Sequence, residues 1–140
     1  MSPNYWGTKR MEEQTKQILL VEDDRFLRKA AEATLCRHGF TVCTAADGEE
    51  ALQRLQAETP DFVLLNLMMP KMQGFEVLRR MKQNPATKQI PVVVLSNLGQ
   101  ESDVQQSLQG GAIAYLIQAN LSLQDLVTHV QKFIAGGIPT

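Results

Sequence analysis

The sequence lacks the features that mark membrane, secreted and nucleic-acid-binding proteins. No stretch approaches the ~18 consecutive apolar residues that span a bilayer, and the first residues lack the apolar centre of a secretory signal. The formal net charge of −1 gives no strongly basic or acidic surface that would indicate a charged partner. We therefore expect a soluble, cytoplasmic protein with neither a nucleic-acid nor a membrane partner.

Cysteine is also scarce. Cys36 and Cys43 stand in a helix-like and a strand-like segment, without the close spacing of a zinc knuckle or a redox pair. The sequence therefore predicts two reduced core thiols, as is usual in the cytoplasm, and neither a disulfide nor a zinc site.

The length of 140 residues and the apolar content of 44% suit one compact domain with its own core. Residues 1–16 are polar apart from Tyr5 and Trp6, and Met11 is a plausible start of its own. We interpret 1–16 as a disordered tail, a mis-called start or a cloning remnant. Residues 17–137 are expected to form the domain, with no output domain after it.

From residue 17 onward, short aliphatic runs alternate with longer segments of helical period, which is typical of βαβ units around a parallel sheet. Most runs are continuously apolar, as expected when helices cover both faces of a sheet. The run at 40–44 alternates instead, so it is predicted to lie at an edge. The expected strands are 18–21, 40–44, 62–65, 92–95 and 114–117, and the expected helices are 25–38, 48–57, 74–83, 101–108 and 123–135.

This order of units predicts an α/β fold, a flavodoxin-like doubly wound sheet of five parallel strands in the order 2-1-3-4-5 with helices on both faces. In such a sheet, ligands bind beyond the carboxyl ends of the strands at the topological switch point. Polar side chains follow four of the five predicted strands, at Glu22, Asp23 and Asp24, at Asn66, at Ser96 and Asn97, and at Gln118.

Three consecutive acids, Glu22, Asp23 and Asp24, follow the first strand. Carboxylate oxygens of this kind suit a hard divalent cation such as Mg²⁺. Asp24 could equally cap the helix that begins near Arg25, where its charge would also favour the helix dipole. Both roles stay open for Asp24, while the cluster as a whole favours a cation site.

The segments Ile18-Leu19-Leu20-Val21-Glu22-Asp23-Asp24 and Val63-Leu64-Leu65-Asn66-Leu67-Met68-Met69-Pro70 resemble the receiver domain of response regulators in two-component signalling. The resemblance covers about residues 17–135 and includes Pro70, Gly74 and Pro91. It implies that Glu22 and Asp23 hold Mg²⁺ together with residue 66 and the main-chain carbonyl of Met68. It also implies that Ser96 senses a phosphoryl group and that Tyr115 is the aromatic switch behind it.

Four positions depart from the receiver pattern. Asn66 stands where receivers carry the phosphate-accepting Asp, Gln118 replaces a Lys that pairs with the phosphoryl group, Ala119 replaces a frequent Pro, and Gln73 replaces a frequent Asp. An amide nitrogen is a poor nucleophile because its lone pair is delocalised into the carbonyl. Asn66 and Gln118 together exchange an ion pair for two neutral amides, which could bond to each other or to Asp23. Since a non-proline cis bond costs ~3–4 kcal/mol, the Gln118–Ala119 peptide is predicted to be trans.

The sequence therefore predicts a single-domain, degenerate receiver, or pseudo-receiver, that is not an enzyme and signals independently of phosphorylation. Its Mg²⁺ binding is expected to be weakened. It would contact a histidine kinase or a downstream protein through a face near Val104, Leu108, Ile113 and Tyr115.

Three alternatives stay open. The first is an ordinary phosphoacceptor receiver in which the Asp at position 66 was changed to Asn, although one such change would explain neither Gln118 nor Gln73. The second is a module that binds a small molecule or an anion at the switch point. The third is retained phosphotransfer, with Asp23 as the acceptor.

Overall fold

The computed structural model describes residues 16–69, 71–97 and 100–135. They form one parallel sheet with the strand order β2-β1-β3-β4-β5, which confirms the predicted topology and the edge position of β2. The strands are β1 (Gln17–Val21), β2 (Thr41–Ala45), β3 (Phe62–Leu65), β4 (Val92–Ser96) and β5 (Ala114–Ile117). The helices are α2 (Arg25–Arg37), α3 (Gly48–Ala57), α4 (Gly74–Gln83), α5 (Glu101–Gln109) and α6 (Leu123–Ile134), with a short 3₁₀ turn, η1 (Gln118–Asn120). The predictions for 1–15, Pro70 and the closing glycines fall outside the described residues.

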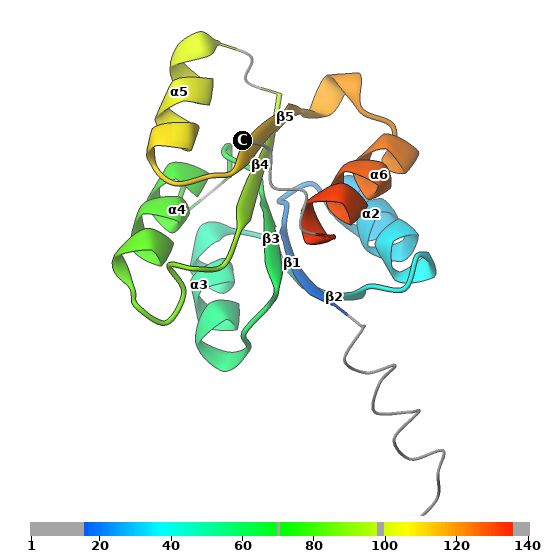
Figure 1. Cartoon of the computed structure of the whole chain (residues 1–140), viewed down its shortest axis with the longest axis horizontal. Helices are drawn as coiled ribbons and strands as arrows, with labels where there is room; N and C mark the ends of the chain where they lie inside the picture. Colours follow the sequence, from blue (N-terminus) through cyan, green and yellow to red (C-terminus); the bar gives the residue numbers. More distant parts are fainter. Residues whose placement is uncertain (1–15, 70, 98–99, 136–140) are drawn as a thin grey trace, which may run out of the picture.

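Helices cover both faces of the sheet, with α3, α4 and α5 on one side and α2 and α6 on the other (Figure 1). The strands supply both cores because successive side chains point to opposite faces. In β1, for example, Leu19 and Val21 pack toward α3 and α4, whereas Ile18 and Leu20 pack toward α2 and α6. This double burial explains why the central strands read as unbroken apolar runs.

Side-chain caps fix three of the helix starts at the carboxyl edge of the sheet, and at α3 the cap is Asp47, whose Oδ1 accepts a 2.8 Å bond from the Glu50 backbone N–H. Asp24 accepts a hydrogen bond of 3.0 Å from the Leu27 backbone N–H, which confirms its capping role. Ser122 and Asp125 form a reciprocal capping box at the start of α6. Because of these caps, the loops after β1 and β5 leave the sheet in a defined direction.

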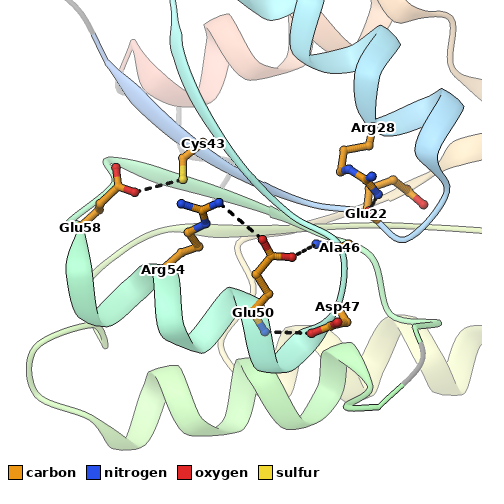
Figure 2. A network of polar contacts seen from close by, with 8 residues as sticks. All are labelled: Glu22, Arg28, Cys43, Ala46, Asp47, Glu50, Arg54 and Glu58. Carbon is orange, nitrogen blue, oxygen red and sulfur yellow. Dashed lines mark hydrogen bonds and ion pairs between the residues drawn. The ribbon is translucent and has the colours of Figure 1, made fainter.

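Both cysteines are free, as expected, but the prediction of core thiols is wrong for Cys36. Cys36 is exposed because it follows the buried Leu35 on α2 and so points away from the core. Cys43 is half-buried on the edge strand β2, and its thiol donates a 3.1 Å hydrogen bond to Glu58 Oε2 (Figure 2). Burial, followed by the bond to Glu58, raises the pKa of the Cys43 thiol.

In the described part of the chain, no helix has the length and apolarity needed to cross a membrane.

Candidate functional site at the carboxyl edge of the sheet

The polar residues that follow the strands meet at one edge of the sheet. Glu22 and Asp23 follow β1, Asn66 follows β3, Ser96 ends β4, and Gln118 follows β5. Hydrogen bonds link four of them across three strands, because parallel strands end at the same edge. Four of the sequence-predicted site residues therefore belong to one hydrogen-bonded cluster.

The Asn66 side chain lies at the centre of this cluster and is only 8% exposed. Its Nδ2 donates to Glu22 Oε2 and to Asp23 Oδ1, each at 3.1 Å. Its Oδ1 accepts a 3.1 Å bond from the Met68 backbone N–H. A flipped amide would set a donor against that N–H and an acceptor against two carboxylates, so the network fixes the orientation.

Gln118 reaches the cluster from the end of β5, and its Nε2 lies 3.4 Å from Glu22 Oε1. Both amides therefore point into the site. The predicted bond from Asn66 to Asp23 is present, whereas the Gln118 amide bonds to Glu22. Glu22 is thus the shared acceptor, which sequence reasoning missed.

Glu22 is a buried carboxylate, only 4% exposed. Its Oε2 also accepts a 3.0 Å bond from the Asp24 backbone N–H. Burial is the main reason that the pKa of Glu22 is raised, and the neighbouring Asp23 raises it further, while the bonds from Asp24 and Gln118 oppose the shift. The site thus holds a carboxylate whose charge is costly and is stabilised by neutral donors.

Arg28 is a further contributor that the sequence analysis missed. Its Nη1 donates to the backbone carbonyls of Glu22 at 2.9 Å and Asp23 at 3.3 Å, and Figure 2 shows its side chain beside Glu22. The contact fixes the path of the acidic loop. A basic residue one turn into the helix after an acidic loop was the available sequence signal.

The arrangement of the cluster bears on which of its atoms could hold a cation. The carboxylates of Glu22 and Asp23 are suitable ligands. Asn66, however, directs its amide N–H groups at these carboxylate oxygens, and an N–H group cannot ligate a cation. Within the described ranges, no group of three or more His, Cys, Asp or Glu is placed to hold a metal ion. The Met68 side chain is 55% exposed, and its backbone N–H is bonded to Asn66.

The remaining predicted positions lie near the cluster or beyond it. Ser96 is completely buried, and Tyr115 is half-buried and pairs with Val94 across β4 and β5. The Gln118–Ala119 peptide is trans, as predicted, and begins the 3₁₀ turn η1. Gly74 packs so closely behind Asn66 that a Cβ there would lie 2.4 Å from the Asn66 backbone oxygen.

The predicted partner face is not continuous. Tyr115 packs against the core on the side of α3 and α4, whereas Ile113 packs against the core on the side of α2 and α6. Ile113 therefore has to be removed from this face. Leu108, on α5, is 40% exposed.

Comparison with known proteins yields a consistent set of relatives. The model of the family described as "Response regulator receiver domain" matches residues 18–131. The transcriptional regulatory protein AfsQ1 of Streptomyces coelicolor is 40% identical over 101 residues, which cover 72% of this chain and 44% of that protein. The chain spans 15% to 54% of the length of the curated relatives that it matches.

Two solved structures are similar in fold and sequence. The phosphorylated cyanobacterial phytochrome response regulator RcpA is 36% identical, with a TM-score of 0.79, and the match covers 86% of this chain and 94% of that one. The Mn²⁺-bound form of response regulator Rcp1 is 34% identical, with a TM-score of 0.73, and the match covers 89% and 96% of the two chains.

Proposed function

Because this chain belongs to the response regulator receiver family, we propose that it is a receiver module that signals without being phosphorylated. Receiver domains act in two-component signalling, where they contact histidine kinases and downstream proteins and typically bind Mg²⁺ at the phosphorylation site. In this chain, Asn66 stands at the acceptor position and Gln118 at that of the phosphoryl-binding lysine.

The observation that carries the proposal is the position of the Asn66 amide between two carboxylates. Its nitrogen is not nucleophilic, so it cannot form the acyl phosphate that an aspartate forms. Its two N–H groups are instead directed at Glu22 and Asp23, at 3.1 Å each. The amide thus stabilises the pair of carboxylates that a cation would otherwise neutralise, and the site is satisfied without phosphate.

The same arrangement supports weak Mg²⁺ binding. A cation that enters between Glu22 and Asp23 has to displace both amide hydrogen bonds, and it gains no third carboxylate in return. The solved structure of the relative Rcp1 is a Mn²⁺-bound form. In this chain we expect the carboxylates to bind divalent cations more weakly than they would beside an aspartate.

A single engineered substitution at position 66 does not account for the site. Gln118 also departs from the receiver pattern, and its amide reaches the same carboxylate as Asn66. The two changes together keep the local charge unchanged while they remove an ion pair. This pairing favours a site that functions with two neutral amides over an ordinary receiver inactivated by one substitution.

Signalling then depends on contacts that bias two states of the domain, because a ligand shifts an equilibrium only by its difference in affinity for the two states. We propose that a cytoplasmic protein partner binds the α5 side of the domain, near Val104, Leu108 and Tyr115. Leu108 offers exposed apolar surface there. The near-zero net charge favours a protein over nucleic acid or a membrane.

Intact-mass measurement after incubation with acetyl phosphate and Mg²⁺ tests phosphorylation independence. The natural chain should gain no phosphoryl group. The double variant Asn66→Asp/Gln118→Lys, which restores acceptor and lysine, should gain one and so proves that the assay works. A stable phosphoryl adduct on the natural chain, on Asp23 or elsewhere, would overturn the proposal.

A further inference from the structure

A small hollow adjoins the site on the side away from Asn66. Its volume is about 120 Å³, whereas one water needs roughly 10–15 Å³ of such space. Its walls come from α2, β4, the start of α6 and the segments that follow β1 and β5, and they are apolar apart from Glu22, Gln118 and Ser122. The main lining residues are Leu27, Leu95, Leu121, Leu126, Glu22 and Gln118.

The polar end of the hollow is formed by the less satisfied oxygen of Glu22. Oε2 has two donors, the Asp24 backbone N–H at 3.0 Å and Asn66 at 3.1 Å. Oε1 has only Gln118 Nε2 at 3.4 Å, which is longer than an ordinary N–H···O bond of about 2.7–3.2 Å. A carboxylate oxygen accepts two bonds readily, so Oε1 has unused capacity inside a largely buried site.

Charge is also unbalanced at this end. The ion pairs found among the described residues involve Glu50, Asp47 and Glu76, and none of them includes Glu22. The Arg28 side chain is close, but its Nη1 donates to the backbone carbonyls of Glu22 and Asp23. A buried carboxylate without a cationic partner favours a ligand that brings both a positive charge and N–H donors.

We propose that this hollow binds a primary ammonium group carried on a short alkyl chain. The ammonium would donate to Glu22 Oε1 and to the Gln118 side-chain oxygen, while the alkyl chain would lie against Leu27, Leu95 and Leu126. The inference rests on the proposed function, because it names a ligand that could bias the domain in place of a phosphoryl group. The ammonium has two sources, a free amine or the lysine side chain of a partner protein.

Lysine from a partner has a favourable approach. Leu27 and Leu123 line the hollow and are 40% and 39% exposed. Their exposed apolar surface forms a rim beside the hollow, and apolar surface of this kind is typical of contact sites. A lysine flanked by apolar residues would therefore bury the rim as its ammonium entered.

The test is an NMR titration of the full chain with n-butylammonium chloride, with n-butanol as the neutral analogue of the same shape. We expect a dissociation constant on the order of millimolar for so small a ligand. Shifts should appear at the Gln118 side-chain amide and at the methyl groups of Leu27 and Leu95. n-Butanol should bind at least tenfold more weakly.

Two variants and one control separate the site from non-specific binding. Glu22→Gln should weaken n-butylammonium binding at least tenfold. Ala31→Leu, which fills the hollow from α2 and keeps the carboxylate, should weaken it as much, so a folding defect in the first variant does not decide the result. Glu58→Gln removes a half-buried carboxylate at the other end of the sheet and should change nothing.

A lysine-containing peptide with apolar neighbours distinguishes the two sources. If the peptide binds more tightly than n-butylammonium and Leu123→Ser removes that gain, the site belongs to a partner lysine. If the two bind equally, the site belongs to a free amine. The proposal is overturned if n-butanol binds as well as n-butylammonium, or if both Glu22→Gln and Ala31→Leu bind n-butylammonium normally. The titration uses no phosphoryl donor, so its failure leaves the intact-mass test of phosphorylation independence unaffected.

Discussion

Replacing Asn66 with aspartate should destabilise this domain when no divalent cation is present. The change removes two N–H donors, which bond to the carboxylates of Glu22 and Asp23. Hydrogen bonds to charged acceptors contribute about 1.5–3 kcal/mol each, so the loss of both amounts to roughly 3 kcal/mol or more. The bond from the Met68 N–H is kept, since a carboxylate oxygen can still accept it.

Repulsion adds to this loss. Two unit charges 4 Å apart interact by about 4 kcal/mol at an effective dielectric constant of 20, although side-chain movement and partial protonation will reduce the penalty. Gln118 brings no positive charge to offset it. We therefore expect Asn66→Asp to lower the free energy of unfolding by about 3–5 kcal/mol, a large share of the ~5–15 kcal/mol of a typical domain.

Urea unfolding followed by far-ultraviolet circular dichroism measures this effect, in EDTA and again in excess Mg²⁺. Mg²⁺ should restore most of the lost stability in Asn66→Asp, because a cation then binds three carboxylates in the folded state only. It should change the natural chain little. Asn84→Asp is the matched control, because it adds the same charge at an exposed position and should cost no more than about 1 kcal/mol.

The outcome in EDTA decides whether the amide matters. If Asn66→Asp unfolds at the same urea concentration as the natural chain, the Asn66 N–H groups contribute nothing and the reasoning is refuted. Equal stabilisation of both chains by Mg²⁺ would likewise show that the natural site still accepts the cation readily.

Three smaller predictions concern other parts of the domain. The buried Ser107 hydroxyl has no partner in the described structure, so Ser107→Ala should leave urea stability unchanged or raise it by about 1 kcal/mol. Ser122→Ala should cost about 1 kcal/mol through loss of the α6 cap. The backbone N–H of Ser122, and after it the Ser122 side chain, lower the pKa of Asp125 below its ordinary 3.8, and Ser122→Ala removes only the side-chain contact. The stabilisation from that contact is complete above pH 3.8 and is lost as the pH falls through the lowered pKa, so the difference between the two chains should shrink there. A thiol reagent at neutral pH should label the exposed Cys36 before Cys43, whose pKa is raised, and mass mapping of the labelled peptides checks the order.

The fold was predictable because several sequence patterns indicate the same helices and strands. The central strands are apolar on both faces, β2 alone alternates, and the caps at Asp24 and Ser122 mark helix starts with side-chain chemistry. Each element boundary found in the structure lies within one residue of its predicted position. Local patterns of this kind depend on neighbouring residues only, so they can be read from the chain itself.

The sequence predicted which residues meet at the site, but it did not predict which hydrogen bonds they form. The strand ends indicated that Glu22, Asp23, Asn66 and Gln118 meet, because parallel strands finish at one edge. Which oxygen each amide selects depends on side-chain torsions and on the 3₁₀ turn after β5, and no periodicity encodes these. The choice of Glu22 as shared acceptor, and the support from Arg28, therefore had to come from the structure.

Errors arose where burial depends on contacts between distant segments. Cys36 follows the buried Leu35 on α2 and is exposed, and Ile113 packs on the side of α2 and α6 instead of the side of Tyr115. For Ile113, the residue precedes β5, and the strand alternation that governs Tyr115 does not extend to it. Alternation predicts the direction of a side chain only inside a strand.

Charge balance links the two unusual amides. Asn66 and Gln118 bond to the two different oxygens of one buried carboxylate, so neither amide can be exchanged for a charged residue without altering the environment of Glu22. An aspartate at position 66 alone adds uncompensated negative charge. A lysine at position 118 alone places a positive charge beside Glu22, while the Asn66 amide still bonds to the other carboxylate oxygen of Glu22. Either single step therefore leaves a site matched neither to phosphate chemistry nor to the neutral network. Coupling of this kind is expected of groups that share a partner, since their effects on stability do not add. It makes the neutral arrangement self-consistent and explains why we treat the two positions as one functional unit.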